Sequence, residues 1–321
     1  MWDILPRTLY HWYRNHLSDY HPDKLCGRWP PLSIQTVDHE TGEVLQEQPV
    51  YVLKPENIGQ KMNIDDKAIG RDGYTVFSNA QTGKIAMLIE SIKEKELAKV
   101  LSFFGNDLLK IKSVCCDMSP TYLKLCTEQM PYAKTVVDKF HVMRYVYDAV
   151  LDVHSTLKKE LAQALSKGKQ KTEQDKEILY DLALLRRCRN RLTQSSDKWS
   201  EPVREQIMLI FSKYRKLKIA YDLSQHFRAW YHVNSHINNQ TQIKDKLTQW
   251  YHKVKESEIE EFYHVAKMIR KHEREILNYF IFGHTNANAE SLNGKIQRFV
   301  ATNYGLRDKD FALYRIAGYF S

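Results

Sequence analysis

Five short strand-like stretches between residues 61 and 137 leave few folds open to this chain. They lie at Lys61–Asp65, Tyr74–Ser78, Lys84–Glu90, Ser113–Cys116 and Thr135–Val137. The second and third are joined by the polar turn Asn79–Gly83, which is typical of a β-hairpin. The fourth and fifth each follow a segment with helical periodicity. Strands linked first by turns and then by helices predict a mixed sheet covered by helices.

The sequence from residue 141 to about 279 has an almost entirely helical pattern. It has few glycines, a single proline (Pro202) and apolar residues at steps of three and four. Two more helices are expected after it, one beginning near Asn286 and one at Asp310–Tyr319. The expected parts are an N-terminal helix and β-hairpin extension at 1–60, the first part of the core at 61–142, an all-α insertion at 143–280 and the last part of the core at 281–321.

The N-terminal extension carries its own pattern of apolar residues. Helical spacing at its start predicts a helix over residues 5–20. Two strands, Ile34–Val37 and Val44–Leu53, are joined by the polar turn 38–42. We expect this extension to pack against the main domain.

The composition excludes several classes of protein. Of the 321 residues, 43% are hydrophobic, which is enough for a packed core. No long apolar run predicts a transmembrane helix, and the first nine residues lack the pattern of a secretory signal. The five cysteines have no C-x-x-C spacing, so neither a zinc finger nor a disulfide framework is indicated. We expect a protein of the reducing cytoplasm.

The net charge of +9 is concentrated in the middle of the chain. Residues 141–285 hold 26 basic and 18 acidic residues, whereas 1–140 hold 17 and 18, and 286–321 hold 5 and 3. A basic block of this kind suits a polyanion such as DNA. A solvated, lysine-rich helical surface fits the charge equally well.

Acidic residues end two of the expected strands, and another opens the late helix. Asp65 and Asp66 end the first strand, Asp117 ends the fourth, and Glu290 lies in the first helical turn. Strand ends in a helix-covered sheet lie close together, and three carboxylates there would need cations to hold them. Oxygen ligands favour Mg²⁺ or Mn²⁺, and two such ions about 3.5–4 Å apart support phosphodiester cleavage. The pattern leaves open which of Asp65 and Asp66 takes part, because neighbouring strand residues point to opposite faces. It also leaves open that each is an ordinary turn or cap residue.

The late helix has two distinct faces. Residues at steps of four and three form the apolar face: Leu292, Ile296 and Phe299. Glu290 and Asn293 fall on the opposite, polar face. Asn286 or Asn288 is the expected N-cap, because a short side-chain oxygen can accept from a first-turn N–H.

Four pieces of sequence in a fixed order resemble a known family. They are Ile64-Asp65-Asp66 with Gly73-Tyr74-Thr75 and Thr82-Gly83-Lys84, then Val114–Tyr122, then Val136–Val142, and last Thr285–Ile296 with Tyr304–Arg307 and Phe311. The span from Ile64 to the C-terminus resembles the DDE transposases of bacterial insertion sequences, and among them the ISL-three group. The resemblance implies a ribonuclease-H-like α/β core, with a mixed five-stranded sheet flanked by helices and interrupted by a large all-α insertion.

The resemblance also implies an active site. It selects Asp65 over Asp66 as the first metal ligand, Asp117 as the second and Glu290 as the third, holding two Mg²⁺ (or Mn²⁺) ions. The implied reaction is hydrolysis of a phosphodiester at the ends of the insertion sequence, followed by strand transfer into target DNA.

Further residues receive supporting or DNA-binding roles. Asp138 and His141 resemble the D-x-x-H element of transposases with helical insertions, and a capping Asp with a buried His is the ordinary alternative. Asn286 and Asn293 flank Glu290 and are expected to orient it or contact a phosphate. The expected DNA-binding residues are Lys295, Arg298, Arg307, Arg187 and Arg191. For Lys295 and Arg307 a plain surface role fits equally well.

The implied partners are terminal-repeat and target DNA in the bacterial nucleoid, with two copies of the chain because two DNA ends are joined. Relatives usually carry a zinc ribbon and a helix-turn-helix before the core, whereas only 64 residues precede Asp65 here. Three explanations are open: end recognition lies on a separate DNA-recognition protein, the reading frame is a fragment of a longer one, or the front helix has taken over part of the role. The alternatives are a catalytically inactive, domesticated DNA-binding protein and a ribonuclease-H-like DNA nuclease without strand transfer.

Overall fold

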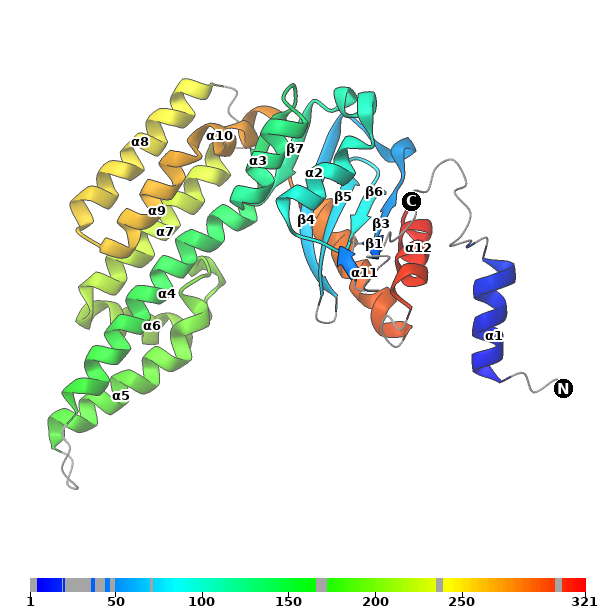
Figure 1. Cartoon of the computed structure of the whole chain (residues 1–321). Coiled ribbons are helices and arrows are strands. Elements are labelled where there is room, and N and C mark those ends of the chain that lie inside the picture. The colour runs from blue at the N-terminus through cyan, green and yellow to red at the C-terminus, as the bar shows by residue number, and fades with distance from the viewer. Residues whose placement is uncertain are drawn as a thin grey trace. The chain divides into compact units, whose positions relative to one another are not determined.

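The chain forms two compact units, which are described separately (Figure 1). The computed structural model describes residues 5–18, 20, 36–37, 44–46, 50–69, 72–165, 172–234, 239–303 and 308–321. The sheet unit comprises Met1–Asp138 and His284–Ser321, and the helical unit comprises Lys139–Gly283. Among the described helices, none has the length and apolar character needed to span a membrane.

A six-stranded sheet with the order β3-β6-β5-β4-β7-β8 forms the centre of the sheet unit. Its strands are β3 Tyr51–Leu53, β4 Lys61–Ile69, β5 Asp72–Asn79, β6 Ile85–Ile89, β7 Ser113–Cys116 and β8 Lys134–Val137. The first four in spatial order pair antiparallel, and β4, β7 and β8 run parallel. Parallel neighbours need a crossover, and a helical segment supplies it before β7 and again before β8. The mixed α/β sheet expected from the sequence is confirmed.

The sheet has one strand more than the five expected. The sequence predicted a single strand over Val44–Leu53, but the structure separates it into two. Its first part belongs to a small antiparallel hairpin, β1 Thr36–Val37 and β2 Val44–Gln46. Its second part is β3, which joins the main sheet because Tyr51 and Leu53 enter one core while Val52 enters the other. Ile34 and the turn 38–42 lie outside the described residues.

Helices cover both faces of the sheet. They are α2 Glu94–Ser102 and α3 Pro120–Gln129 on one face, and α11 Ala287–Thr302 and α12 Lys309–Tyr319 on the other. Met62 and Ile64 of β4 point into the core under α2 and α3. Ile69 points into the core under α11 and α12, where it meets Leu292 and Ile296. The two faces of β4 therefore meet different helices, and α11 lies over the face of its odd-numbered residues.

The N-terminal helices pack onto α12. They are α1 Pro6–Trp12 and the π-helix Tyr13–Leu17. The rings of Tyr10 and Phe311 meet edge to face at 5.9 Å. The guanidinium of Arg14 donates to Asp308 at 2.5 Å, and it also lies over the Tyr20 ring. This part of the extension thus packs against the main domain, as expected.

The helical unit contains seven described α-helices. They are α4 Lys139–Ala164, α5 Glu173–Cys188, α6 Glu201–Lys213, α7 Arg215–Asn234, α8 Gln240–Ser257, α9 Glu260–Lys271 and α10 Glu273–Phe282. Its core is rich in aromatic rings, with Phe227 packed between Trp230 and Trp250 at centroid distances of 5.2 and 4.7 Å. Such ring pairs add stability beyond their buried area.

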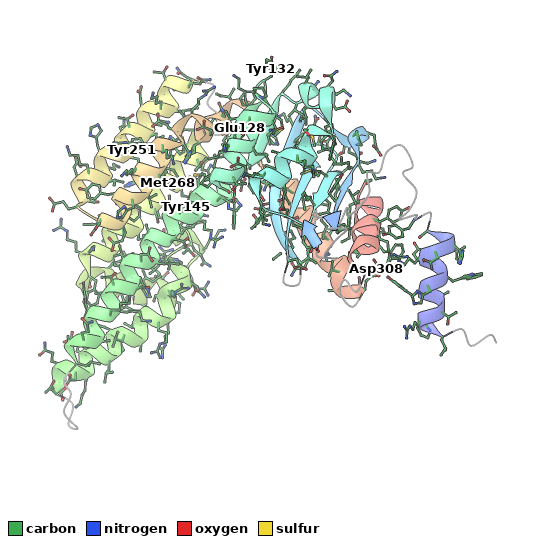
Figure 2. The ribbon with its side chains drawn as sticks, in the orientation of Figure 1. Glu128, Tyr132, Tyr145, Tyr251, Met268 and Asp308 are labelled. Carbon is green, nitrogen blue, oxygen red and sulfur yellow. The ribbon has the colours of Figure 1, made fainter. Side chains whose placement is uncertain are left out.

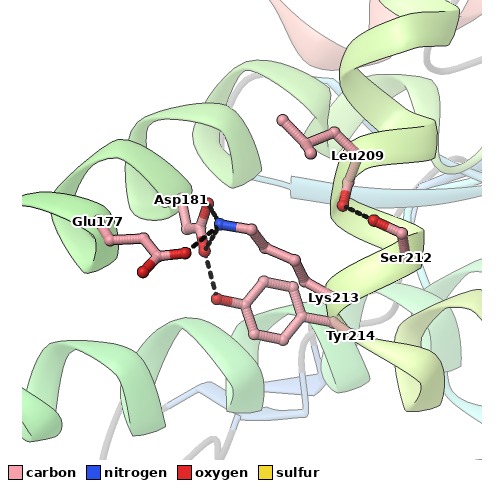
Figure 3. Close-up of polar contacts among 6 residues, drawn as sticks. All are labelled: Glu177, Asp181, Leu209, Ser212, Lys213 and Tyr214. Carbon is pink, nitrogen blue, oxygen red and sulfur yellow. Dashed lines mark hydrogen bonds and ion pairs between the residues drawn. The ribbon is translucent and has the colours of Figure 1, made fainter. Parts of the chain in front are cut away.

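A polar cluster ties α5 to the junction of α6 and α7 (Figure 3). The ammonium of Lys213 lies 3.1 Å from both oxygens of Asp181 and 2.7 Å from Glu177. The hydroxyl of Tyr214 donates to Asp181 at 2.7 Å. Tyr214 leaves the helical conformation, with φ −119° and ψ 77°, so α6 ends there and α7 begins as a separate helix.

Candidate active site

Polar side chains alternate along β4 on the face that α11 covers. Asn63, Asp65 and Lys67 occupy every second position of this strand, and each contacts a residue of the segment from His284 to Gln297. Asn63 is fully buried and Asp65 is 7% exposed. β4 thus presents a row of polar side chains to α11 and to the segment that precedes it. Asp66 points the other way and is exposed.

Asp65 does not lie at the end of its strand, as the sequence suggested. β4 continues four residues further because its antiparallel pairing with β5 extends to Ile69. The parallel pairing with β7 stops earlier, at Asn63 opposite Cys115. Asp65 therefore lies beyond the part of β4 that pairs with β7.

Both oxygens of the Asp65 carboxylate accept hydrogen bonds. Oδ1 accepts from the backbone N–H of Asp66 at 3.0 Å, and Oδ2 accepts from the amide of Asn293 at 2.8 Å. Asn293 is 8% exposed, so it does not lie on a solvent-facing polar face of α11 as expected. It turns toward the sheet because β4 offers a carboxylate there instead of an apolar side chain.

Asp117 lies at the matching position on the neighbouring strand. Asp65 and Asp117 each lie two residues beyond the last paired positions of β4 and β7, Asn63 and Cys115. The Asp117 carboxylate accepts from the backbone N–H of Ser119 at 2.8 Å, which orders the turn into α3. It is half-buried, so it combines a turn contact with access from outside.

Asp138 follows β8 and connects the sheet to the start of α11. It is 3% exposed, and its Oδ1 accepts from the backbone N–H of Asn286 at 3.3 Å. Asn286 is the N-terminal flanking residue of α11, but its side chain makes no capping bond, contrary to the expectation. The Asn286 side chain is fully buried, and neither of its polar atoms has a partner among the described residues.

A buried histidine joins the same segment to two strands. His284 lies 3.0 Å from the hydroxyl of Ser113 on β7 and 2.8 Å from the side-chain oxygen of Asn63 on β4. Burial, with a smaller contribution from Lys61, lowers the pKa of His284 to about 4. The ring is therefore neutral at pH 7, and one ring nitrogen donates while the other accepts.

The carboxylates raise the pKa of neighbouring groups. Burial raises the pKa of the Cys115 thiol well above its usual value, and Asp138 and Asp65 raise it further. Burial also raises the pKa of Tyr122 on α3, whose hydroxyl contacts Thr75, and three aspartates including Asp117 add to this effect. The negative charge of these strand ends thus reaches both faces of the sheet.

Glu290 lies in the first turn of α11 and is exposed. Asn293, one turn later on the same helix, contacts Asp65, so the helix with Glu290 packs on the face of the sheet that carries Asp65. Within the described ranges, no three His, Cys, Asp or Glu side chains are grouped closely enough to hold a metal ion. The three-carboxylate metal site therefore stays a prediction.

The comparison with protein families decides the identity of this fold and site. A profile of a transposase family, the DDE type named after the ISL-three element, matches residues 62–316. The chain belongs to the ISL-three group of DDE transposases. A search of curated proteins and a search of solved structures each found no match.

The other predicted residues of this transposase lie in both units. His141 is on the first turn of α4 and Arg187 on the last turn of α5, both in the helical unit. Arg191 follows α5 and donates to Gln194 at 3.2 Å. Lys295 and Arg298 are exposed on α11, and Arg307 lies outside the described residues. The DNA-binding roles stay predictions.

Three residues next to the candidate site were not predicted from the sequence. Asn63, Ser113 and His284 form the buried contacts that fix the segment before α11 to the sheet. A strand period of two would have found Asn63, because it precedes Asp65 by two residues and therefore lies on the same face of the strand. Nothing local in the sequence indicates that His284 reaches strands 171 and 221 residues away.

Proposed function

We propose that this transposase cleaves phosphodiester bonds at the ends of its insertion sequence and joins the freed 3′ ends to target DNA. One observation carries the proposal. Asp65 and Asp117 occupy matching positions on adjacent parallel strands, and the helix with Glu290 packs on the face of Asp65. Carboxylates at such a sheet edge are suited to holding cations against a phosphate.

The donor chemistry of the site fits two Mg²⁺ or Mn²⁺ ions. Asp65, Asp117 and Glu290 would hold them, since hard cations prefer carboxylate oxygens. Both polar side-chain atoms of Asn286 and the side-chain oxygen of Asn293 are buried and have no partner in the described part of the chain. Asn293 contacts Asp65 through its amide nitrogen, and the backbone N–H of Asn286 contacts Asp138. Such orphaned polar atoms are typical of a site completed by a ligand. When bound, two ions supply an activated water or hydroxyl and stabilise the leaving oxygen.

The protein's own residues position the reacting groups. Asn293 holds one oxygen of Asp65, so the other lone pairs of that carboxylate keep a fixed direction. Asp138 holds the start of α11 through the N–H of Asn286, and this fixes the helix turn that carries Glu290. His141 would contact DNA near the scissile phosphate, and Arg187 and Arg191 would hold flanking or target DNA through its phosphates.

Two further parts of the proposal follow from the reaction. Joining two DNA ends requires two active sites, so two copies of the chain act together in the assembled complex. Sequence-specific reading of the ends would come from a separate DNA-recognition protein or from α1. The reaction takes place on the chromosome, in the bacterial nucleoid.

The test uses a labelled duplex with the end sequence of the insertion element, a target plasmid and Mg²⁺. We expect labelled strand joined to the plasmid. Cleavage without joining would indicate a nuclease, and binding without cleavage would indicate a domesticated DNA-binding protein. Either result would contradict the proposal.

Neighbouring carboxylates provide the matched control. We expect Asp65→Asn and Glu290→Gln to reduce cleavage and joining to background, because each removes a charge from the metal site. Asp66→Asn should leave both steps near the wild-type rate, since Asp66 faces away from α11. If Asp66→Asn abolishes activity and Asp65→Asn does not, the first metal ligand is Asp66 and not Asp65.

A further inference from the structure

A hollow of about 540 Å³ lies between α11 and α12. Its volume is within the range of roughly 300–1,000 Å³ for pockets that hold small ligands. Its lining combines basic and aromatic side chains: Lys295, Arg298, Phe299, Thr302, Tyr319 and Phe320. None of these residues serves the carboxylate site described above.

The aromatic side chains of the hollow lie next to one another, and the ring of Tyr319 is exposed among them. Phe299 lies 5.7 Å from Tyr319, and Tyr319 lies 4.9 Å from Phe320, measured between ring centroids. Arg315 lies over Phe299 at 5.1 Å and supports it. The carbonyl of Phe320 accepts from the N–H of Ile85 on β6, which ties these aromatic residues to the sheet. Tyr319 is 73% exposed, so its ring is available for stacking.

The basic part of the hollow lies on the helix that carries Glu290. Lys295 and Arg298 are both exposed and share one face of α11 with Thr302, at steps of three and four. Arg298 follows Glu290 by eight residues, which is about 12 Å along a helix. In B-form DNA that distance corresponds to three or four nucleotides of one strand, at about 3.4 Å each.

We propose that this hollow receives one unpaired base of the DNA strand held at the acidic residues, three or four nucleotides from the phosphate that is cleaved. Tyr319 stacks on the base, and Lys295 and Arg298 contact the adjoining phosphates. An unpaired base fits better than duplex DNA, because the face of a base is open to an aromatic ring only outside the helical stack. This inference rests on the proposed function in one respect: the proposed function identifies the bound strand as the DNA strand that is cleaved.

The test measures binding of a 12-nucleotide single strand with one 2-aminopurine to the full-length protein in EDTA. Stacking quenches 2-aminopurine, so we expect quenching with wild type. Loss of one stacking contact costs on the order of tenfold in affinity. Tyr319→Ala and Tyr319→Leu should both lose about tenfold and the quenching, whereas Tyr319→Phe should stay within about twofold. Tyr319→Leu keeps the apolar bulk, so it separates lost stacking from lost folding.

Tyr132 provides the matched control in the same unit. It is 77% exposed, close to the value of Tyr319, and lies in the turn before β8 (Figure 2). We expect Tyr132→Ala to bind as wild type. Arg298→Gln should weaken binding and reduce the slope of log affinity against log salt by about one, because one phosphate contact is lost. Quenching at saturating protein should stay at the wild-type level.

Three outcomes would overturn the inference. The first is wild-type affinity and quenching in Tyr319→Leu. The second is competition by a blunt duplex as strong as that by the unlabelled single strand, and the third is competition of that same strength by free dAMP. The EDTA keeps this test separate from catalysis. If binding behaves as expected but no DNA is cleaved in Mg²⁺, the proposed function fails and the base-binding site stands.

Discussion

Asn293 donates its amide to Asp65 at 2.8 Å in a buried position, so it controls how that carboxylate is presented. We predict that Asn293→Leu raises the Mg²⁺ concentration for half-maximal cleavage by about 10- to 100-fold, the usual effect of removing a partner of a metal ligand. Asn288→Leu is the control, because Asn288 is exposed on the same helix and bonds the carbonyl of Ala80 instead. An unchanged Mg²⁺ titration for Asn293→Leu would show that Asp65 does not depend on this amide.

His284 makes stability depend on pH. Its pKa is lowered from 6.5 to about 4 in the folded chain, so protons bind the unfolded chain first as the pH falls. The contribution of neutral His284 to the free energy of unfolding is present in full above pH 6.5. It decreases by about 3 kcal/mol as the pH falls to 4. We predict that urea unfolding shows wild type more stable than His284→Gln at pH 7, and that the difference shrinks by about this amount at pH 4. A constant difference between the two proteins would contradict the lowered pKa.

The contact between α5 and the α6–α7 junction is expected to stabilise the helical unit. Asp181 is 2% exposed, and Lys213 is its cationic partner. We predict that Lys213→Met lowers the free energy of unfolding by about 3 kcal/mol, because it leaves a buried carboxylate with only Tyr214 as a described side-chain donor. Lys218→Met, which removes an exposed pair with Asp222, should cost less than about 1 kcal/mol. Equal effects in chemical denaturation would refute the distinction.

Most secondary-structure elements could be predicted from the sequence, because their periodicity is local. The strand Ser113–Cys116 and the helix α2 before it are as expected, since both depend on residues close in the chain. The length of β4 and the place of β3 were not predictable, because each is set by pairing with another strand. The orientation of Asn293 was missed for a related reason. A polar residue of a helix can face a sheet when the sheet presents a carboxylate, and that partner lies 228 residues away.

The division of charge between the two units gives the last prediction. The helical unit, Lys139–Gly283, holds 27 basic and 18 acidic residues, and the rest of the chain holds 21 of each. The whole net charge of +9 therefore belongs to the helical unit. Phosphate contacts release counterions, so the slope of log affinity against log salt reports how many are made. The helical unit should supply most of that slope.

This prediction can be tested by removing the helical unit. Asp138 accepts a hydrogen bond from the N–H of Asn286, so the two chain ends left by the excision lie close enough for a short Gly-Ser linker. We expect residues 1–138 linked to 284–321 to keep a cooperative thermal transition, because both cores of the sheet lie within this unit. Its affinity for a duplex should depend on salt far less steeply than that of the whole chain. A folded excision variant with an unchanged salt slope would place the phosphate contacts on the sheet unit, and the basic insertion would then be only a solvated surface.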